Sequence, residues 1–170
     1  MIKKILKTID AISEYSGRIT SWLCVLLVLM LSFETFIRYA FNAPTTWVYV
    51  ITMMMFGAIC FMGLGYVERY DSHIRVDVLY RFFSPRAKAL LNVLQTIILL
   101  FPLLYYLLKV SIFWMIAAWA EHEVWRQSIW FPPAGPFRTV VVLGILIYGL
   151  QSLATFTRNI LFLVKGERND

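Results

Sequence analysis

Residues 46–67 read TWVYVITMMMFGAICFMGLGYV, a run of 22 residues without one charged side chain. A helix needs about 20 mostly apolar residues to cross a bilayer, so this run is long enough to span the hydrocarbon core. Working outward from it, the chain contains four predicted spans, at about 19–40, 46–67, 87–118 and 139–164. All four are expected to be helices, because an open strand leaves its backbone groups unsatisfied in lipid.

The composition of the whole chain agrees with this prediction. Charged residues make up 15% of the 170 residues, against about 25% in a typical soluble domain. The pI near 9.5 could suggest a nucleic-acid partner. The basic residues, however, flank apolar runs rather than gathering on a soluble face, which is typical of membrane topology. We therefore expect one all-α integral membrane domain, residues 1–170, with no nucleic-acid partner and no internal repeat.

The first eighteen residues have a different pattern from the spans. Apolar residues recur at helical spacing, and lysines fall largely on the other side of the helix. This pattern predicts an amphipathic helix that lies on the membrane surface. The apolar residues are Ile2, Ile5, Leu6, Ile9 and Ile12, and the lysines are Lys3, Lys4 and Lys7.

The distribution of basic residues predicts the orientation. They are concentrated in the N-terminal segment, in the loop between the second and third spans, and after the fourth span, and only Arg126 and Arg138 lie in the opposite loops. Cytoplasmic segments carry the excess of Lys and Arg, so both termini are expected in the cytoplasm. The turn at 41–45 and the tryptophan-rich loop at 119–138 then face outside.

Three charged residues lie in or near the spans. Glu34 and Arg38 are four residues apart with Glu first, an order that suits a helical ion pair. Lys109 lies deep in the third span. Such charges are candidates for function. They could instead extend to the interface and fix the depth of the helix, and Lys109 could also contact a partner subunit.

Two further features belong to the third span. Ser84 and Pro85 form a helix start, with Ser as the cap and Pro at the first position. Pro102 should kink the span or allow it to be longer than the bilayer is thick. The tryptophans that follow match an aromatic belt at the outer interface; they are Trp114, Trp119, Trp125 and Trp130.

The sequence lacks the motifs of common catalytic sites. It has no phosphate-binding loop, no dinucleotide fingerprint and no arrangement typical of a catalytic triad. His73 and His122 fall in loops on opposite sides, and Cys24 and Cys60 lie in apolar segments as small hydrophobic residues. We expect no enzyme activity and no cofactor in this chain. No span carries the central unpaired carboxylate that proton-coupled carriers use.

The stretch HIRVDVLY, residues 73–80, alternates polar and apolar residues between two spans. In an extended segment, Arg75 and Asp77 lie on the same side. Asp77 could instead cap a short helix. The stretch is either a solvated loop with cytoplasmic charges or a structured loop that fixes helix packing or a partner interface.

Several motifs resemble one known family. They are RYAFNAP at 38–44 followed by Trp47, the HIRVDVLY stretch followed by FSPR at 83–86 and Lys88, and Pro132-Pro133 before the fourth span, which contains Gly144 and Gln151. Together they resemble the DctQ-like small membrane subunits of tripartite ATP-independent periplasmic (TRAP) transporters. The family often has glutamates shortly after the tryptophan, where this chain has Val48 and Tyr49. Roles of those carboxylates are therefore not expected here.

The resemblance implies a function and a set of partners. It implies an accessory scaffold in a bacterial inner membrane, in contact with lipid, beside a large DctM-like membrane subunit that binds substrate and Na⁺ and moves them. A periplasmic binding protein would deliver the substrate, commonly an organic acid. The candidate structural or interface residues are Glu34, Arg38, Trp47, His73, Arg75, Asp77, Lys109, Trp114 and Trp119. The alternatives are a stand-alone small carrier or channel and a membrane anchor subunit of a redox complex.

Overall fold

The computed structural model of the chain describes residues 2–70, 84–126 and 129–165. Within these ranges nearly all residues are helical. The elements are α1 (Ile2–Phe41), α2 (Thr46–Arg69), α4 (Pro85–Gln95), the π-helical turn η1 (Thr96–Leu100), α5 (Phe101–Ala120) and α6 (Gly135–Lys165). The elements α4, η1 and α5 follow one another without a break, so they form one long helical segment.

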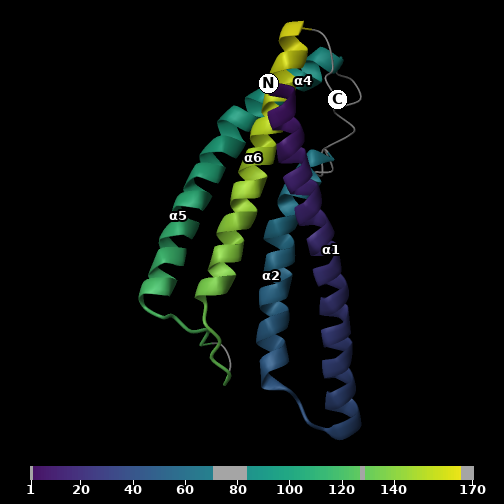
Figure 1. The fold of residues 1–170 in the computed structure, drawn as a ribbon, viewed down its shortest axis with the longest axis vertical. Helices are drawn as coiled ribbons and strands as arrows, with labels where there is room; N and C mark the ends of the chain where they lie inside the picture. The colour runs from purple at the N-terminus through teal and green to yellow at the C-terminus, as the bar shows by residue number, and fades with distance from the viewer. Residues whose placement is uncertain (1, 71–83, 127–128, 166–170) are drawn as a thin grey trace.

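The helices form two antiparallel hairpins that pack against each other (Figure 1). α1 and α2 are joined by the turn at 42–45, and α5 and α6 by the loop at 121–134. α6 packs most extensively on α2 and also contacts α1, α4 and α5. The start of α1 and the end of α6 lie at one end of the bundle, called here the terminal end, and these two connections lie at the other, called the turn end (Figure 1).

Four helical segments in the described ranges are long and apolar enough to cross a membrane. They contain the four predicted spans, so the all-α membrane fold is confirmed. The observed helices extend beyond the predicted limits, because apolar composition marks the part that fits the bilayer and not where the helix ends. The fourth helix begins at Gly135 rather than near Thr139, with Pro136 in its first turn, where the missing N–H of proline has no helical partner to lose.

The predicted surface helix at the N-terminus is wrong as a separate element. Residues 2–41 form one continuous helix of 40 residues, so the basic segment runs on from the first span. Its apolar stripe only partly faces the rest of the bundle: Ile5 and Ile12 are exposed, whereas Leu6 is buried, as are Ser13 and Ser16 outside the stripe. In lipid, helices gain little from burying apolar surface against each other, and small or polar residues favour close helix contact.

The third helical segment starts and bends as expected. The Ser84 hydroxyl accepts a hydrogen bond from the Ala87 N–H at 3.3 Å, and Pro85 opens the helix. Because Pro102 has no N–H to donate, one hydrogen bond of the regular helical ladder is missing at this position. The π-helical turn η1 lies directly before it, with the Phe101 N–H bonded to the Thr96 carbonyl, and the helix changes direction between α4 and α5 (Figure 1).

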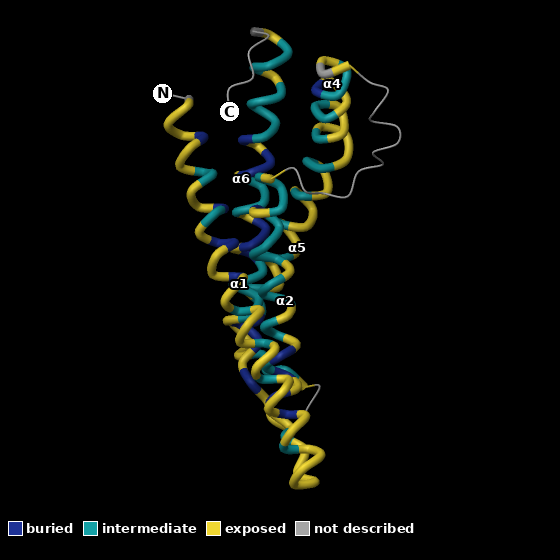
Figure 2. The backbone as a smooth tube through the Cα atoms, turned by 90° about the vertical axis from the view of Figure 1, so that its right-hand side faces the viewer, coloured by how far each residue is buried: buried dark blue, intermediate teal, exposed yellow. Residues whose placement is uncertain are grey.

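Glycines allow α2 and α6 to approach closely. A Cβ atom at Gly144 of α6 would lie 2.7 Å from the backbone carbonyl of Phe61 in α2. A Cβ atom at Gly65 of α2 would lie 2.7 Å from the Ile147 side chain of α6. Ordinary contacts of this kind are 3.4–4 Å, so the two helices depend on glycine at both positions. Figure 2 shows buried residues where α1, α2 and α6 lie together, within a chain that is otherwise largely exposed.

Candidate functional site

A carboxylate on α1 ties the first helix to the second at the turn end. Arg38 donates to Glu34 Oε1 from Nη2 at 2.8 Å, which confirms the predicted ion pair. Glu34 also accepts hydrogen bonds from the backbone N–H of Thr45, at 3.3 Å, and from the Thr45 hydroxyl. Thr45 is the residue that precedes the first turn of α2. The buried Glu34 carboxylate therefore fixes the position at which α2 begins relative to α1.

A second tie at the turn end joins α5 and α6. Arg138 in the first turn of α6 donates to Glu123 Oε1 at 2.6 Å and to the backbone carbonyl of Trp114 at 2.9 Å. Its guanidinium lies 5.8 Å from the centre of the Trp114 ring. The indole N–H of Trp119 donates to the Thr139 hydroxyl at 3.0 Å. Both tryptophans thus help to hold the second hairpin while their rings remain more than half exposed.

A polar network at the terminal end joins α1 to α6. Ser13 donates to Gln151 Oε1 at 2.8 Å, and Gln151 Nε2 donates to Asp10 Oδ1 at 3.1 Å. Arg158 donates to the other oxygen of Asp10. Ser13 and Gln151 are completely buried. Buried polar groups are costly unless they are paired, and each group in this network satisfies its neighbour.

The same network continues to the end of α2. Arg69 Nη1 donates to the Asp10 carbonyl at 2.9 Å and to Glu14 Oε2 at 2.6 Å. The Tyr70 hydroxyl donates to Glu14 Oε2 at 2.7 Å. This hydrogen bond to a carboxylate raises the pKa of Tyr70, so the phenol keeps its proton. α1, α2 and α6 are thereby held together by charged hydrogen bonds at one level.

On α1 and on α6, the paired charges lie at two levels along the helix, separated by about the thickness of a membrane. On α1, Glu14 and Arg18 precede Glu34 and Arg38 by twenty residues, and on α6 Arg138 precedes Arg158 by twenty. Twenty helical residues rise about 30 Å, which is the thickness of a hydrocarbon core. On each helix the two levels are therefore as far apart as the two interfaces of a bilayer. The levels are staggered between the hairpins, because Phe137 of α6 lies beside Gly57 of α2, well short of the Glu34 tie (Figure 1).

The remaining predicted residues lie apart from these ties. Trp47 is in the first turn of α2 and is partly exposed. Lys109 is exposed on α5 and makes no hydrogen bond or ion pair within the described part of the chain. Three predicted residues fall outside the described residues, and their roles stay predictions; they are His73, Arg75 and Asp77.

Sequence reasoning missed the terminal-end network. A signal was present: Asp10, Ser13 and Glu14 are spaced at i, i+3 and i+4, and therefore share one face of a helix. Gln151 and Arg158 are seven residues apart and share a face of α6 in the same way. These stripes predict polar faces. Which stripe meets which depends on how the helices cross.

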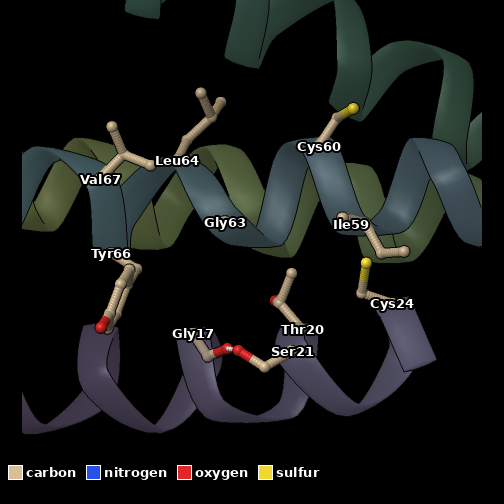
Figure 3. A pocket seen from close by; sticks show the side chains of 10 residues that line it. All are labelled: Gly17, Thr20, Ser21, Cys24, Ile59, Cys60, Gly63, Leu64, Tyr66 and Val67. Atoms are coloured by element: carbon tan, nitrogen blue, oxygen red, sulfur yellow. Dashed lines mark hydrogen bonds between the residues drawn. The ribbon is translucent and has the colours of Figure 1, made fainter. Parts of the chain in front are cut away.

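A shallow groove separates parts of α1 and α2 toward the terminal end (Figure 3). It has a volume of about 400 Å³ and is lined mainly by apolar and small residues, among them Gly17, Cys24, Cys60 and Gly63. A Cβ atom at Gly17 would overlap the Tyr66 ring, which points toward α1 (Figure 3). Cys24 and Cys60 are both free thiols. No cluster of residues suited to a metal ion occurs in the described ranges.

Comparisons with known proteins match this architecture to one family. Residues 27–162 match the family model described as the DctQ component of tripartite ATP-independent periplasmic transporters. Neither the curated proteins nor the solved structures contain a match to the chain. The matched residues include the last part of α1, all of α2 and α5 and most of α6, together with the Glu34 tie, the Arg138 tie and Gln151. The chain therefore belongs to the DctQ family of TRAP transporter components.

Proposed function

We propose that the chain is a static accessory subunit of a sodium-coupled TRAP transporter that imports an organic acid. Its partners would be a large DctM-like membrane subunit, which binds the substrate and Na⁺ and moves them, and a periplasmic substrate-binding protein. The subunit would reside in the bacterial inner membrane with both termini cytoplasmic. It would bind no cofactor and catalyse no reaction. The family match supports the transporter context.

The observation that carries the scaffold role is the pairing of charges at two levels. At the terminal end Asp10 bonds to Arg158, and Glu14 bonds to Arg69. At the turn end Glu34 bonds to Arg38, and Glu123 bonds to Arg138. The two terminal-end pairs join α1 to α2 and to α6. At the turn end, Glu34 also accepts the Thr45 N–H before α2, and Arg138 of α6 also donates to the Trp114 carbonyl of α5. Relative sliding of the helices would break charged hydrogen bonds, so the bundle is suited to remain fixed while a partner moves.

The proposed orientation is supported by the basic residues around the terminal end. Lys3, Lys4, Lys7 and Arg86 surround this end, and the excess of Lys and Arg favours its placement in the cytoplasm. The turn end, with its tryptophans on α5, would then face the periplasm. The periplasmic binding protein would approach the complex from that side.

The proposal is tested by purifying the full chain in mild detergent after co-expression with a DctM-like large membrane subunit from the same genome. We expect the two to elute together at a fixed ratio. The matched control is the same large subunit expressed with an affinity-tagged, unrelated four-span protein, which should not retain it. Elution of the chain alone, together with uptake by the chain alone in liposomes, would instead support a stand-alone carrier. A purified chain with the absorption spectrum of haem or flavin would support a redox anchor.

A further inference from the structure

One charged side chain lies between the two levels of paired charges. In the described helices, the segments between the levels on α1, α2 and α6 contain no Asp, Glu, Lys or Arg, whereas α5 contains Lys109. Lys109 is exposed and has no hydrogen-bonding or ionic partner in the described chain. An ionisable group inside a membrane span, facing outward without a partner of its own, indicates a contact outside the chain.

Two tyrosines extend the polar character of this face. Tyr105 and Tyr106 precede Lys109 by four and three residues, so the three side chains lie on one side of α5. The tyrosines are 62% and 64% exposed. The centres of their rings lie 5.4 Å apart in an edge-to-face arrangement. Their hydroxyls make no hydrogen bond to described residues. We call Tyr105, Tyr106, Lys109 and the exposed Phe113 the α5 outer face.

Measured from the Arg138 tie, the two tyrosines lie too deep for an ordinary interfacial belt. Arg138 bonds to the Trp114 carbonyl, so the turn-end level crosses α5 near Trp114. With a rise of 1.5 Å per residue, Lys109 lies about 7.5 Å inside that level and Tyr105 about 13.5 Å inside it. In a hydrocarbon core about 30 Å thick, the tyrosines are near the middle. Tyrosine at a lipid interface keeps its hydroxyl among headgroups, which this depth does not allow.

The position of α5 in the bundle leaves this face open. α5 packs chiefly on α6, at the edge of the bundle (Figure 1). In the most apolar stretch of the third helical segment, no residue is buried by the rest of the described chain. Lipid tails offer no acceptor for an ammonium group or for two phenols. A neighbouring protein helix can offer such acceptors, and tyrosine is enriched at protein interfaces for this reason.

We propose that the α5 outer face docks on a transmembrane helix of the large membrane subunit, and that this helix presents a carboxylate to Lys109. The phenols of Tyr105 and Tyr106 would donate to side-chain or backbone oxygens of the same helix, and Phe113 would pack beside it. This inference rests on the proposed function, because it takes the large subunit as the occupant. It adds the docking face, its depth and the charge of the partner group.

The first test measures how much co-expressed large subunit is retained by variants at Lys109. Lys109→Glu places like charges opposite each other, and we expect at least tenfold less retained subunit. Lys109→Gln keeps hydrogen-bonding groups without the charge and should lose less, whereas Lys109→Arg keeps the charge and should retain most. Because Lys109 has no partner in the described chain, the melting temperature of each isolated variant should match that of the wild type.

The second test places a photocrosslinking residue at Tyr105, Lys109 or Phe113 in the assembled complex. The control is Leu29 on α1, which is 61% exposed. We expect crosslinks from the three α5 positions to the large subunit, and lipid adducts at Leu29. Phospholipid adducts alone at Lys109, with full retention of the large subunit by Lys109→Glu, would overturn the proposal and assign the amine to a lipid phosphate.

The two proposals fail in distinguishable ways. If the wild-type chain does not retain the large subunit, the proposed function is wrong and the docking face has no occupant. If the wild type retains it and all Lys109 variants do so equally, with crosslinks from α1 instead, the accessory role stands and the α5 docking face is wrong.

Discussion

Replacing Gly144 by alanine tests the packing on which the whole bundle depends. The added Cβ atom would lie 2.7 Å from both the carbonyl carbon and the carbonyl oxygen of Phe61. These are backbone atoms of the neighbouring helix, so no side-chain rotation can make room. The contact is about 0.7 Å shorter than ordinary packing allows, and α2 and α6 must shift apart to relieve it.

Gly149→Ala on the same helix is a matched control. A Cβ atom there meets nothing within 4 Å. Both substitutions gain the same helix propensity, about 1 kcal/mol in favour of alanine, so the comparison cancels that gain. Overpacking of a core contact costs about 1–3 kcal/mol. We therefore expect Gly144→Ala to be less stable than Gly149→Ala by about 1–3 kcal/mol, or roughly 2–12 °C in melting temperature.

The assay is thermal unfolding of the two purified variants and the wild type in the same mild detergent, followed by circular dichroism. Gly149→Ala should melt at or above the wild-type temperature, and Gly144→Ala below Gly149→Ala. Equal melting temperatures for the two variants would mean that α2 and α6 do not meet at Phe61. The packing of the two hairpins described above would then be wrong.

Three further predictions concern the polar ties and the orientation. Glu34→Ala removes the carboxylate shared by Arg38 and Thr45 and should lower the free energy of unfolding by about 1–3 kcal/mol. The control is Thr35→Ala, which should change it little because the Thr35 hydroxyl bonds only to the Leu31 carbonyl of its own helix. Equal losses of stability for the two variants would contradict the contact between Glu34 and Thr45. Asp10→Ala leaves Arg158 and the buried Gln151 without their shared acceptor and should destabilise by about 1.5–3 kcal/mol, while the exposed Lys7→Ala on the same helix should melt like the wild type. A reporter enzyme that is active only outside the cytoplasm should be active when fused after Ala134 and silent when fused after Asp170; the reverse result would invert the orientation.

The spans were predictable because the bilayer imposes a length on any apolar helix. Residues 46–67 contain no charge over 22 positions, and the observed α2 begins at Thr46 as expected. The start at Ser84 and the bend before Pro102 follow from local chemistry, a hydroxyl cap and a missing N–H, so they too were visible in the sequence. The ion pair of Glu34 and Arg38 was also visible in the sequence, because the two residues are neighbours on one helix.

Contacts between helices were not predictable in this way. The bond from Thr45 to Glu34 requires a chain reversal, and the network of Asp10 with Arg158 joins residues 148 positions apart. Hydrophobic periodicity also misled at the N-terminus, where the isoleucine stripe indicated a surface helix. In a membrane both faces of a helix meet apolar surroundings, so the stripe does not say which face the neighbours cover.

The most direct test of the accessory role is uptake of a radiolabelled organic acid into proteoliposomes with each component omitted in turn. The complete system contains this chain, the large membrane subunit, the binding protein loaded with its substrate, and an inward sodium gradient. We predict that uptake requires all four, and that removing this chain abolishes or strongly reduces it although the large subunit still binds substrate. Full uptake by the large subunit without this chain, with the binding protein and the gradient present, would contradict the account.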